Sequence, residues 1–476
     1  MHNKRNGPLS YAPAFAALLG ITFSLQAWSE GHSLLISALI SLLVSSSWIF
    51  IGTIDPPGRW TWAFLCVIIM TFAISLCLMI RMEHDDPLPS TIRTEGRILL
   101  NREWGRRRAL LISTPYGRVT SYMHPSAAPA EGSGVRVRGA LFDHKRADKK
   151  GGFDEFLYWR SKGAIKKMVP LDIEVTSLPG GIYRWRNFLE RKINDELPDL
   201  MSGYMLALTL GIRDKKLAEK HRQAGTVHLL AVSGFHVGIL AAAAGVFIKR
   251  GKIRTVMISV LIWSYLALAG FPPGGVRAGI MLQVYLLGLL FGKPSCPFNS
   301  VSIAGIIMLL WEPWTFHDIG WRLSMLAALS ICSAAAVSSE SGSGAFMGSA
   351  AVWFVTAPLI ALAFGEVPVA GLIINIAAIP LFALIFPFVL ISSIPAFMQL
   401  PFSYETASAC EYILEGWDIF SEKIVELIPW SVVLTLPLAL FAAFIFFASA
   451  SYASGMSAKR ITVSSVMFSL LVLILS

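Results

Sequence analysis

Three apolar segments open the chain. They cover Tyr11–Trp28, Ser33–Ile54 and Trp60–Ile80, and each approaches the roughly 20 apolar residues that a helix needs to cross a bilayer. The first segment lacks the small-residue cleavage site of a secretory signal, and two further apolar segments follow it closely. We therefore predict three retained spans, so that residues 1–80 form an N-terminal three-helix membrane segment.

Residues 81–180 follow another pattern, in which apolar and polar side chains alternate over short runs. The runs include Gly96–Leu100, Arg108–Ser113 and Val135–Leu141, with glycine and proline between them. Alternation is typical of strands that bury one face. Several short strands joined by such turns predict a small β-barrel, and the length of the region suits an OB-like barrel.

A charged, helical segment follows at Ile182–Leu200, where Arg184, Arg186 and Lys192 stand beside aromatic and aliphatic residues. This mixture predicts an amphipathic helix on the membrane surface. The apolar run Gly203–Ile212 is too short to cross the bilayer. We assign residues 181–212 to interfacial helices.

Apolar windows return in residues 213–476, which we assign to a membrane channel domain. Spans are predicted near 226–248, 255–270, 276–291, 299–312, 319–337, 346–364, 431–450 and 461–476, with a proline-broken hairpin at 369–398. With the first three, these make about 10–13 membrane helices or half-helices. Broken helices at membrane depth are tolerated where they line a cavity or pack on protein, so the pattern favours a transporter or channel.

Composition agrees with a polytopic α-helical membrane protein, because 55% of the residues are hydrophobic and 15% are charged, against about a quarter charged in soluble proteins. The formal net charge is +10. Basic clusters at Lys4 and Arg5, at Lys249–Arg254 and at Lys459 and Arg460 set the orientation. They predict a multi-pass protein of the cytoplasmic membrane with a cytoplasmic N-terminus, which makes the barrel extracytoplasmic.

The five cysteines form no CxxC pair, and residues 81–200 contain none. The sequence therefore predicts no disulfide framework and no thiolate metal site. No cofactor is indicated.

Two histidines, His228 and His236, stand within the apolar run Val227–Leu240, with Ser233 and Gly234 between them. Ionisable residues inside a span are costly and usually face an interior. If the run is one helix, residues eight positions apart lie about 80° from each other around its axis. Two interpretations remain open: the histidines line a polar path, or they hydrogen-bond within the bundle and hold helices together.

The run from His228 reads HLLAVSGFHVGIL, and other distinctive segments flank it. They are GGFDEFLYWRSKG at 151–163, LALTLGIR at 206–213, GFPPGGVRAGIM at 270–281, DIGWRLS at 318–324, and the pair 357–364 and 375–380. In their residues and in their order along the chain, they resemble the signature elements of the ComEC competence family. The resemblance covers about residues 81–400.

The resemblance implies a channel that passes one strand of incoming DNA across the cytoplasmic membrane during natural transformation, with an external OB-like domain that engages DNA. It also implies a third domain, of metallo-β-lactamase type, that degrades the other strand. The sequence contains no HxHxDH motif and no P-loop. We therefore expect a form without that domain and without enzymatic activity, which would work with a separate nuclease and a cytoplasmic ATPase or helicase.

Two groups of residues are candidates for contact with DNA. The channel-lining candidates are His228, Ser233, Gly234, His236, Arg277, Asp318, Arg322 and Asn375. The candidates on the OB-like domain are Arg106, Arg107, Arg108, Arg136, Arg138 and Lys145, since single-strand binders combine basic grooves with aromatic side chains. A basic face that lies on anionic membrane lipid is the alternative. Asp318 and Arg322, at i and i+4, are expected to pair with each other.

Two rival functions stay open. A membrane-embedded metalloenzyme would use His228, His236 and Asp318 as ligands. A secondary transporter for a small or lipid-linked substrate would share the same hydropathy pattern.

Overall fold

The computed structural model describes residues 13–52, 58–84, 88–147, 152–248, 251–292, 297–338, 344–433, 435–453 and 456–474. Lys4, Arg5, Lys249 and Arg250, which contribute to the predicted orientation, lie outside the described residues.

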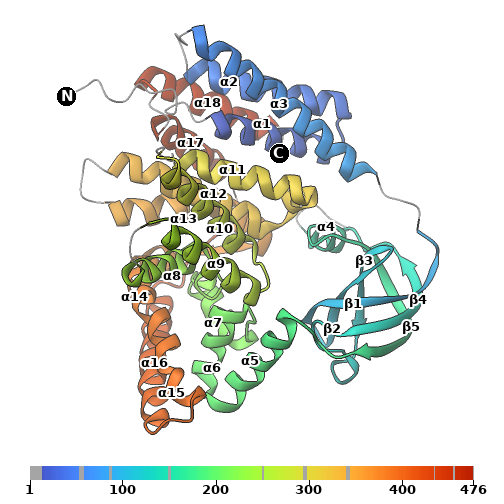
Figure 1. The fold of residues 1–476 in the computed structure, drawn as a ribbon. Coiled ribbons are helices and arrows are strands. Elements are labelled where there is room, and N and C mark those ends of the chain that lie inside the picture. Colours follow the sequence, from blue (N-terminus) through green and yellow to red (C-terminus); the bar gives the residue numbers. More distant parts are fainter. Residues whose placement is uncertain are drawn as a thin grey trace.

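Helices from the two ends of the chain pack together (Figure 1). They are α1 (Pro13–Ser29), α2 (Leu34–Gly52) and α3 (Gly58–Glu83) from the N-terminus, with α17 (Leu436–Ala453) and α18 (Ala458–Ile474). The ring of Phe15 on α1 lies 4.9 Å from that of Trp48 and 6.3 Å from that of Phe446. Aromatic contacts of this kind join segments more than 400 residues apart, so the first three spans belong to the same helical body as the last two.

Five strands form a closed barrel in the order β1-β2-β3-β5-β4. They are β1 (Thr91–Trp104), β2 (Arg107–Thr114), β3 (Gly117–Met123), β4 (Gly134–Phe142) and β5 (Ala164–Ser177), with the short helix α4 (Glu155–Arg160) before β5. Neighbouring strands are antiparallel except β3 and β5, which are parallel. Ile98, Leu110 and Val135 fill the barrel interior, as the alternation of apolar residues predicts.

Short helices connect the barrel to the second helical block. The predicted interfacial helix is α5 (Ile182–Glu196), followed by α6 (Asp199–Met205), a π-helical turn η3 (Leu206–Leu210), α7 (Lys215–Gln223) and the 3₁₀ turn η4 (Val227–Leu229). The helix α5 exposes Trp185 and Phe188 and buries Arg186 and Ile193. It is amphipathic, as predicted, although its buried face includes an arginine.

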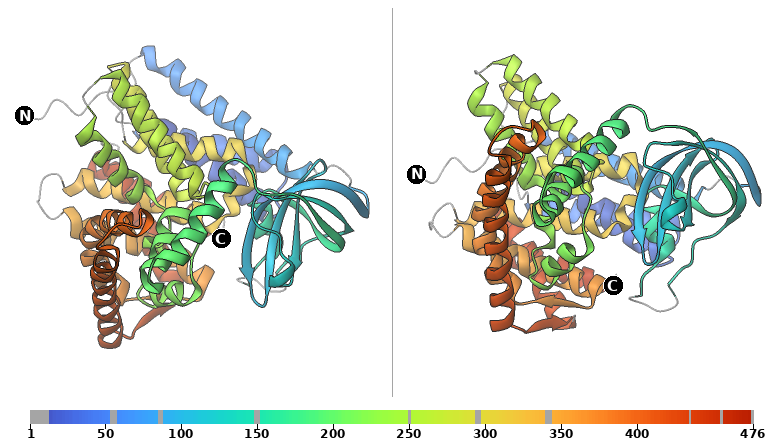
Figure 2. Two further views of the ribbon diagram at one scale, coloured as in Figure 1. Left: turned by 60° about the horizontal axis from the view of Figure 1, so that its bottom comes forward. Right: turned by 90° about the horizontal axis from the view of Figure 1, so that it is seen from below.

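The second block contains α8 (Gly234–Phe247), α9 (Lys252–Leu268), α10 (Pro273–Leu290), α11 (Pro297–Trp311), η5 (Pro313–His317), α12 (Ile319–Ser338) and α13 (Gly344–Phe364). It continues with α14 (Ala370–Ser392), α15 (Ile394–Phe397) and α16 (Ser403–Leu427), while β6 (Glu366–Pro368) pairs with β7 (Ser431–Val433). In two further views the barrel also lies at one side of this helical body (Figure 2).

Two predictions of helix boundaries are wrong. The window 226–248 is not one helix, because α8 begins at Gly234 and His228 lies in the separate turn η4. The angle of about 80° between the histidines therefore does not apply. The expected hairpin at 369–398 is a single helix, α14, with Pro380 and Pro387 inside it. Proline removes one backbone hydrogen bond, and packing on neighbouring helices compensates for that loss in an apolar bundle.

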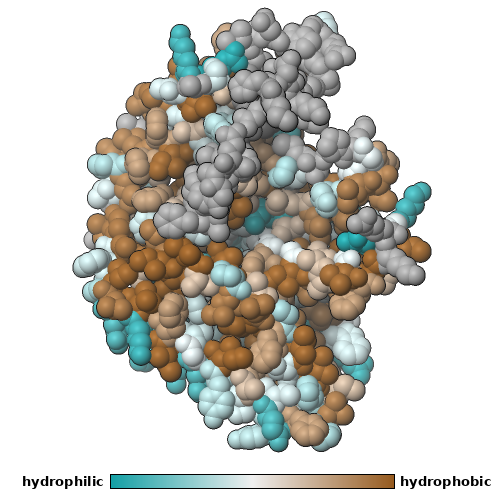
Figure 3. All heavy atoms as spheres, turned by 90° about the vertical axis from the view of Figure 1, so that its left-hand side faces the viewer, coloured by the Kyte–Doolittle hydropathy of each residue, from teal (hydrophilic) through white to brown (hydrophobic). Residues whose placement is uncertain are grey.

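Several helices are apolar enough to meet lipid. Four described helices reach spanning length: Leu34–Ile51, Trp62–Glu83, Pro273–Leu290 and Ala370–Phe397. Five more apolar helices are shorter, among them α8 and α11. Hydrophobic side chains cover much of one face of the molecule, with hydrophilic ones towards its lower edge (Figure 3). The chain is therefore a membrane protein with an inserted five-stranded barrel.

Candidate functional site

His236 occupies the first turn of α8 and is fully buried. Its Nδ1 accepts a hydrogen bond from the backbone N–H of Ser233 at 3.2 Å, and the Ser233 hydroxyl caps the same helix end. Because Nδ1 is an acceptor, Nε2 carries the proton. Nε2 has no hydrogen-bond partner in the described part of the chain, and the ring lies edge-on to Phe386 at 4.7 Å. A buried donor without a partner is costly, which marks His236 as a functional candidate.

Arg277 on α10 lies beside the same helix end. Its guanidinium donates to the backbone and the hydroxyl oxygens of Ser324 on α12. A Cβ added to Gly234 would lie 3.5 Å from an Arg277 nitrogen, so glycine allows the arginine to approach the start of α8. The Nε of Arg277 has no partner among the described residues. Ser233, Gly234, His236 and Arg277 thus form one cluster, which we call the α8 cluster.

His228 lies in η4, six residues before α8 begins at Gly234. Its side chain is exposed.

Asp318 and Arg322 do not form the expected pair. Asp318 pairs with Lys162 of the barrel at 3.2 Å and also accepts a hydrogen bond from the Trp321 backbone N–H at 3.1 Å. Arg322 donates instead to the Phe316 carbonyl oxygen at 2.7 Å and lies over the Phe316 ring. A cation from a distant segment has taken the position that a helical neighbour was expected to fill.

Asn375 lies in a third place, on α14. Its amide nitrogen donates to the carbonyl oxygen of Gly225 at 3.5 Å, while its Oδ1 has no partner among the described residues. Gly225 has a positive φ of 68° and packs against Gly371, since a Cβ on Gly225 would lie 2.8 Å from the Gly371 Cα. Asn375 therefore bonds a backbone group of the loop that contacts α14.

The cationic candidates of the barrel differ in their contacts and exposure. Arg108 donates to the Asn101 side chain at 2.6 Å, and Arg136 lies between Glu95 and Glu174 at 3.1 and 3.2 Å. Arg106, Arg107, Arg138 and Lys145 are exposed. For Arg106, Arg107 and Arg138 the described residues provide no ion-pair partner.

The sequence analysis missed the contacts that attach the barrel to the helices. Lys162 reaches Asp318, and Arg186 of α5 bridges Glu131 of the barrel at 3.2 Å to the carbonyl oxygens of Leu210 and Leu268. Arg160 lies over the Trp314 ring in η5. In the sequence, only the charge of Arg186 among the apolar residues of α5 pointed to these contacts.

A second polar network was also missed. The Tyr204 hydroxyl lies 2.8 Å from His221 Nε2 and donates to Asp418 at 3.1 Å, and His221 Nδ1 lies 2.8 Å from the Thr226 hydroxyl. Lys220 pairs with the same Asp418. Burial lowers the pKa of His221 to about 4. The network connects α6, α7 and α16 directly beside His228.

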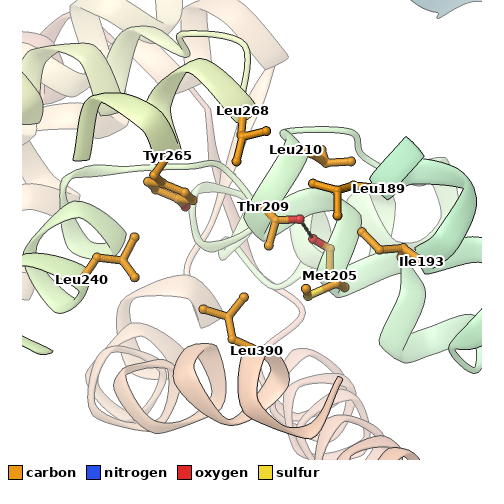
Figure 4. A pocket seen from close by; sticks show the side chains of 9 residues that line it. All are labelled: Leu189, Ile193, Met205, Thr209, Leu210, Leu240, Tyr265, Leu268 and Leu390. Carbon is orange, nitrogen blue, oxygen red and sulfur yellow. Dashed lines mark hydrogen bonds between the residues drawn. The ribbon is translucent and has the colours of Figure 1, made fainter. Parts of the chain in front are cut away.

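A recess between α5, η3, α8, α9 and α14 contains none of the candidate residues (Figure 4). Leu189, Leu240, Leu268 and Leu390 contribute to its apolar wall, and Thr209 turns its hydroxyl to the Met205 carbonyl oxygen at 2.5 Å. Figure 4 shows these side chains converging from separate elements. The recess suits an apolar group and lies apart from the α8 cluster.

The metalloenzyme hypothesis has no geometric support in the part of the chain that the structure describes. No three His, Cys, Asp or Glu side chains there lie close enough to share a metal ion. His236 is in the α8 cluster, whereas Asp318 is bound to Lys162 at the barrel junction. The three proposed ligands therefore do not form one site.

Comparison with known proteins assigns this chain to a family. Residues 208–469 match the family described as Competence protein. The chain is 27% identical to ComE operon protein 3 of Bacillus subtilis over 254 residues, which are 48% of this chain and 32% of that protein. It is 28% identical to an uncharacterized protein of Aquifex aeolicus over 51% of this chain and 60% of that one. The chain thus matches less than two thirds of the length of these relatives.

Proposed function

From the premise that this chain belongs to the competence protein family, we propose that it is a channel for single-stranded DNA in the cytoplasmic membrane during natural transformation. Membership of the family supports a role in competence DNA uptake. Three points go further and are parts of the proposal: that the DNA is single-stranded, that it moves into the cell, and that this chain forms the channel.

The α8 cluster carries this proposal. Arg277 is only 8% exposed and lies at the first residues of α8. A helix start carries a partial positive charge, which favours phosphate. Arg277 adds a full positive charge, and His236 Nε2 adds a donor without a partner in the described residues. Three features that attract an anion thus lie at or beside the first turn of α8, inside an apolar bundle.

The barrel supports the same function. Its strand order, with β3 parallel to β5, is consistent with an OB-type barrel, a fold whose strands and loops bind oligonucleotides. Arg106, Arg107 and Arg138 remain available for phosphate, because the structure gives them no ion-pair partner among the described residues. In this proposal the barrel is extracytoplasmic and receives the strand before the helices do.

Division of labour with other proteins is part of the proposal. The sequence has neither the HxHxDH motif of a two-metal nuclease nor a P-loop. We propose that this chain translocates DNA without cleaving it, and that a separate nuclease and a cytoplasmic ATPase or helicase act with it.

Uptake of labelled DNA into cells that carry His228→Ala, Ser233→Ala, His236→Ala or Arg277→Ala tests the channel. We expect at least a tenfold loss for Arg277→Ala, since a lost charged contact to phosphate is worth about 1.5–3 kcal/mol. Ser330→Ala is the matched control, because the Ser330 hydroxyl is buried and bonds only within its own helix. Unchanged uptake in all four variants, at equal protein levels, would reject the channel assignment.

A transporter of lipid-linked substrates is the second candidate, and the apolar recess of Figure 4 favours it. Its leucine-rich wall would accept an acyl chain. Leu240→Trp would fill that recess. Loss of DNA uptake in the α8-cluster variants with normal uptake in Leu240→Trp supports the DNA channel. Normal DNA uptake in all of these variants, with loss of acyl-lipid transport in Leu240→Trp, supports the lipid transporter.

A further inference from the structure

The polar groups that border the apolar recess of Figure 4 are already used by the protein. The Thr209 hydroxyl donates to the Met205 carbonyl oxygen at 2.5 Å, and the Tyr265 hydroxyl donates to the Leu208 carbonyl oxygen at 2.7 Å. The remaining side chains of the wall are those of leucine, isoleucine and methionine. A buried water needs two or more polar partners, so the recess suits a hydrocarbon group instead.

The size of the recess limits how much hydrocarbon it can hold. Its volume is about 170 Å³, and an apolar cavity of roughly 150 Å³ in another protein accommodates benzene. The recess therefore takes about six carbon atoms of an acyl chain, and not a whole lipid. Leu240 and Leu390 in its wall are only half-buried, so the rest of such a chain can continue outwards along the surface of the protein.

An aromatic and basic rim borders the recess on α5, beside the wall residue Leu189. Trp185 and Lys192 are four positions before and three positions after Leu189, so the three side chains share one face of the helix. Trp185 and Phe188 are exposed, and their rings lie 6.3 Å apart. The Lys192 ammonium lies 5.9 Å from the centre of the Phe188 ring and 5.8 Å from that of Phe397 on α15. Tryptophan and lysine in this arrangement are typical of a helix at the level of the lipid headgroups.

The charge of Lys192 has no counter-charge in the part of the chain that the structure describes. Asp195 and Glu196 follow it on α5, but they border a different groove, together with Gln399 and Tyr404. A lipid phosphate beside the recess would supply an anionic partner, since lysines near the membrane surface attract anionic headgroups.

We propose that the recess holds an acyl-chain segment of one anionic phospholipid, whose phosphate pairs with Lys192. The bound chain packs against the segments that attach the barrel. Leu210 and Leu268 line the recess, and their carbonyl oxygens accept hydrogen bonds from Arg186. Arg186 also pairs with Glu131 of the barrel. The lipid is thus a structural part of the junction between barrel and helices, and its binding requires neither DNA transport nor lipid transport.

Binding of radiolabelled dioleoyl-phosphatidylglycerol to the full-length, delipidated protein in detergent tests the site. Dioleoyl-phosphatidylcholine is the comparison lipid, because it has the same chains and no net charge. In the wild type we expect phosphatidylglycerol to bind more tightly and to raise the unfolding temperature, since a ligand of the folded state stabilises it. Lys192→Gln is expected to raise Kd for phosphatidylglycerol about fivefold and to leave Kd for phosphatidylcholine within about twofold, because it removes attraction to the anionic headgroup only.

Arg184→Gln is the matched charge control. Arg184 is exposed on α5 and stands five positions before Leu189, which places it about 140° away around the helix axis. The variant is expected to leave Kd for both lipids within about twofold, because the lost charge lies away from the recess. Equal weakening of phosphatidylglycerol binding by Arg184→Gln and Lys192→Gln would overturn the proposal, as would equal Kd values of the two lipids in the wild type.

Three variants of the wall test the place of the acyl chain. Leu240→Trp and Leu390→Phe fill the recess from different helices, and each is expected to raise Kd for both lipids by about tenfold or more, since less of the chain is then buried. Leu240→Ala enlarges the recess and is expected to retain binding, which separates filling from misfolding. Unchanged Kd in both filled variants would overturn the proposal. If they instead convert a dimer into a monomer at unchanged lipid affinity, a second copy of the chain occupies the recess and the proposal is wrong.

Discussion

The Nζ of Lys162 lies 3.2 Å from an Asp318 carboxylate oxygen, which joins the barrel to the first turn of α12. The two residues are 156 positions apart. Their side chains are 23% and 14% exposed, so water screens the pair only in part. Asp318 at the same time accepts a hydrogen bond from the Trp321 backbone N–H. One carboxylate thus caps a helix and anchors the barrel.

Lys162→Met is expected to lower the free energy of unfolding by about 1–3 kcal/mol, because it leaves a half-buried carboxylate without its cation. Thermal unfolding in detergent measures the effect. Lys166→Met is the control, since its partner Asp143 is 76% exposed and such pairs contribute less than about 1 kcal/mol. Equal effects of the two variants would contradict the anchoring role of Lys162.

Ser233 and His236 are expected to act as one unit at the start of α8. Each alanine substitution alone should cost about 1 kcal/mol of stability, because both residues satisfy backbone N–H groups that the helix leaves free. The double variant should cost less than the sum of the single ones. Strictly additive losses, measured by thermal unfolding of all four proteins, would show that the capping interactions are independent.

Gly371 allows α14 to touch the loop before η4. A Cβ there would lie 3.1 Å from the Gly225 Cα and 3.4 Å from the Ala224 carbonyl oxygen. We expect Gly371→Ala to destabilise the protein by about 1–3 kcal/mol through overpacking. Gly416→Ala on α16 is the matched control, because nothing lies within 4 Å of the added carbon. That variant should be neutral or stabilised by up to about 1 kcal/mol.

The free energy of unfolding should decrease as the pH falls, because His221 is buried in its neutral form. Its pKa is about 4 in the folded protein against 6.5 ordinarily, and burial is the main cause. The unfolded chain therefore binds more protons between about pH 6.5 and pH 4. The contribution of His221 is complete above pH 6.5 and is lost by about 3 kcal/mol as the pH falls to 4.

His221→Gln should flatten the dependence of the unfolding temperature on pH across that window. His124→Gln, at an exposed position on the barrel, is the control, and an equal change of the curve in both variants would contradict the assignment to His221. A wild-type curve that is flat from pH 6.5 to 4 would contradict the buried, neutral state of His221.

The barrel cations should differ in their contribution to DNA binding. Arg136 is held between Glu95 and Glu174, whereas Arg106 and Arg107 have no ion-pair partner in the described residues. Arg106→Ala combined with Arg107→Ala should weaken oligo(dT) binding more than tenfold at low salt, and Arg136→Ala less than threefold. A larger effect of Arg136→Ala would show that its carboxylate partners release it when DNA binds.

Strands and helices were predictable from the sequence where a local pattern of apolar and polar residues defines them. Alternation located the strands that bury Ile98, Leu110 and Val135, and the amphipathic pattern located α5. The break before Gly234 was not predicted, because the run from Val227 to Leu240 is apolar on both sides of Ser233. Hydropathy does not distinguish a continuous span from a turn followed by a capped helix.

The candidate residues divide in the same way. Ser233, Gly234, His236 and Arg277 were named from sequence, and the fold brings them into one cluster. Asp318 and Asn375 were also named, but they lie at other contacts. Lys162 was not recognised as the partner of Asp318, since nothing local in the sequence relates two residues that are 156 positions apart.

The sequence by itself determined the membrane class, the barrel and the family, because hydropathy, alternation and motif order depend on neighbouring residues. The tertiary structure alone decided which charges meet. Asp318 has Arg322 within one helical turn, yet it pairs with Lys162 from the barrel. An ion pair forms where two side chains are held at a short distance with little water between them, and packing of distant segments sets both conditions.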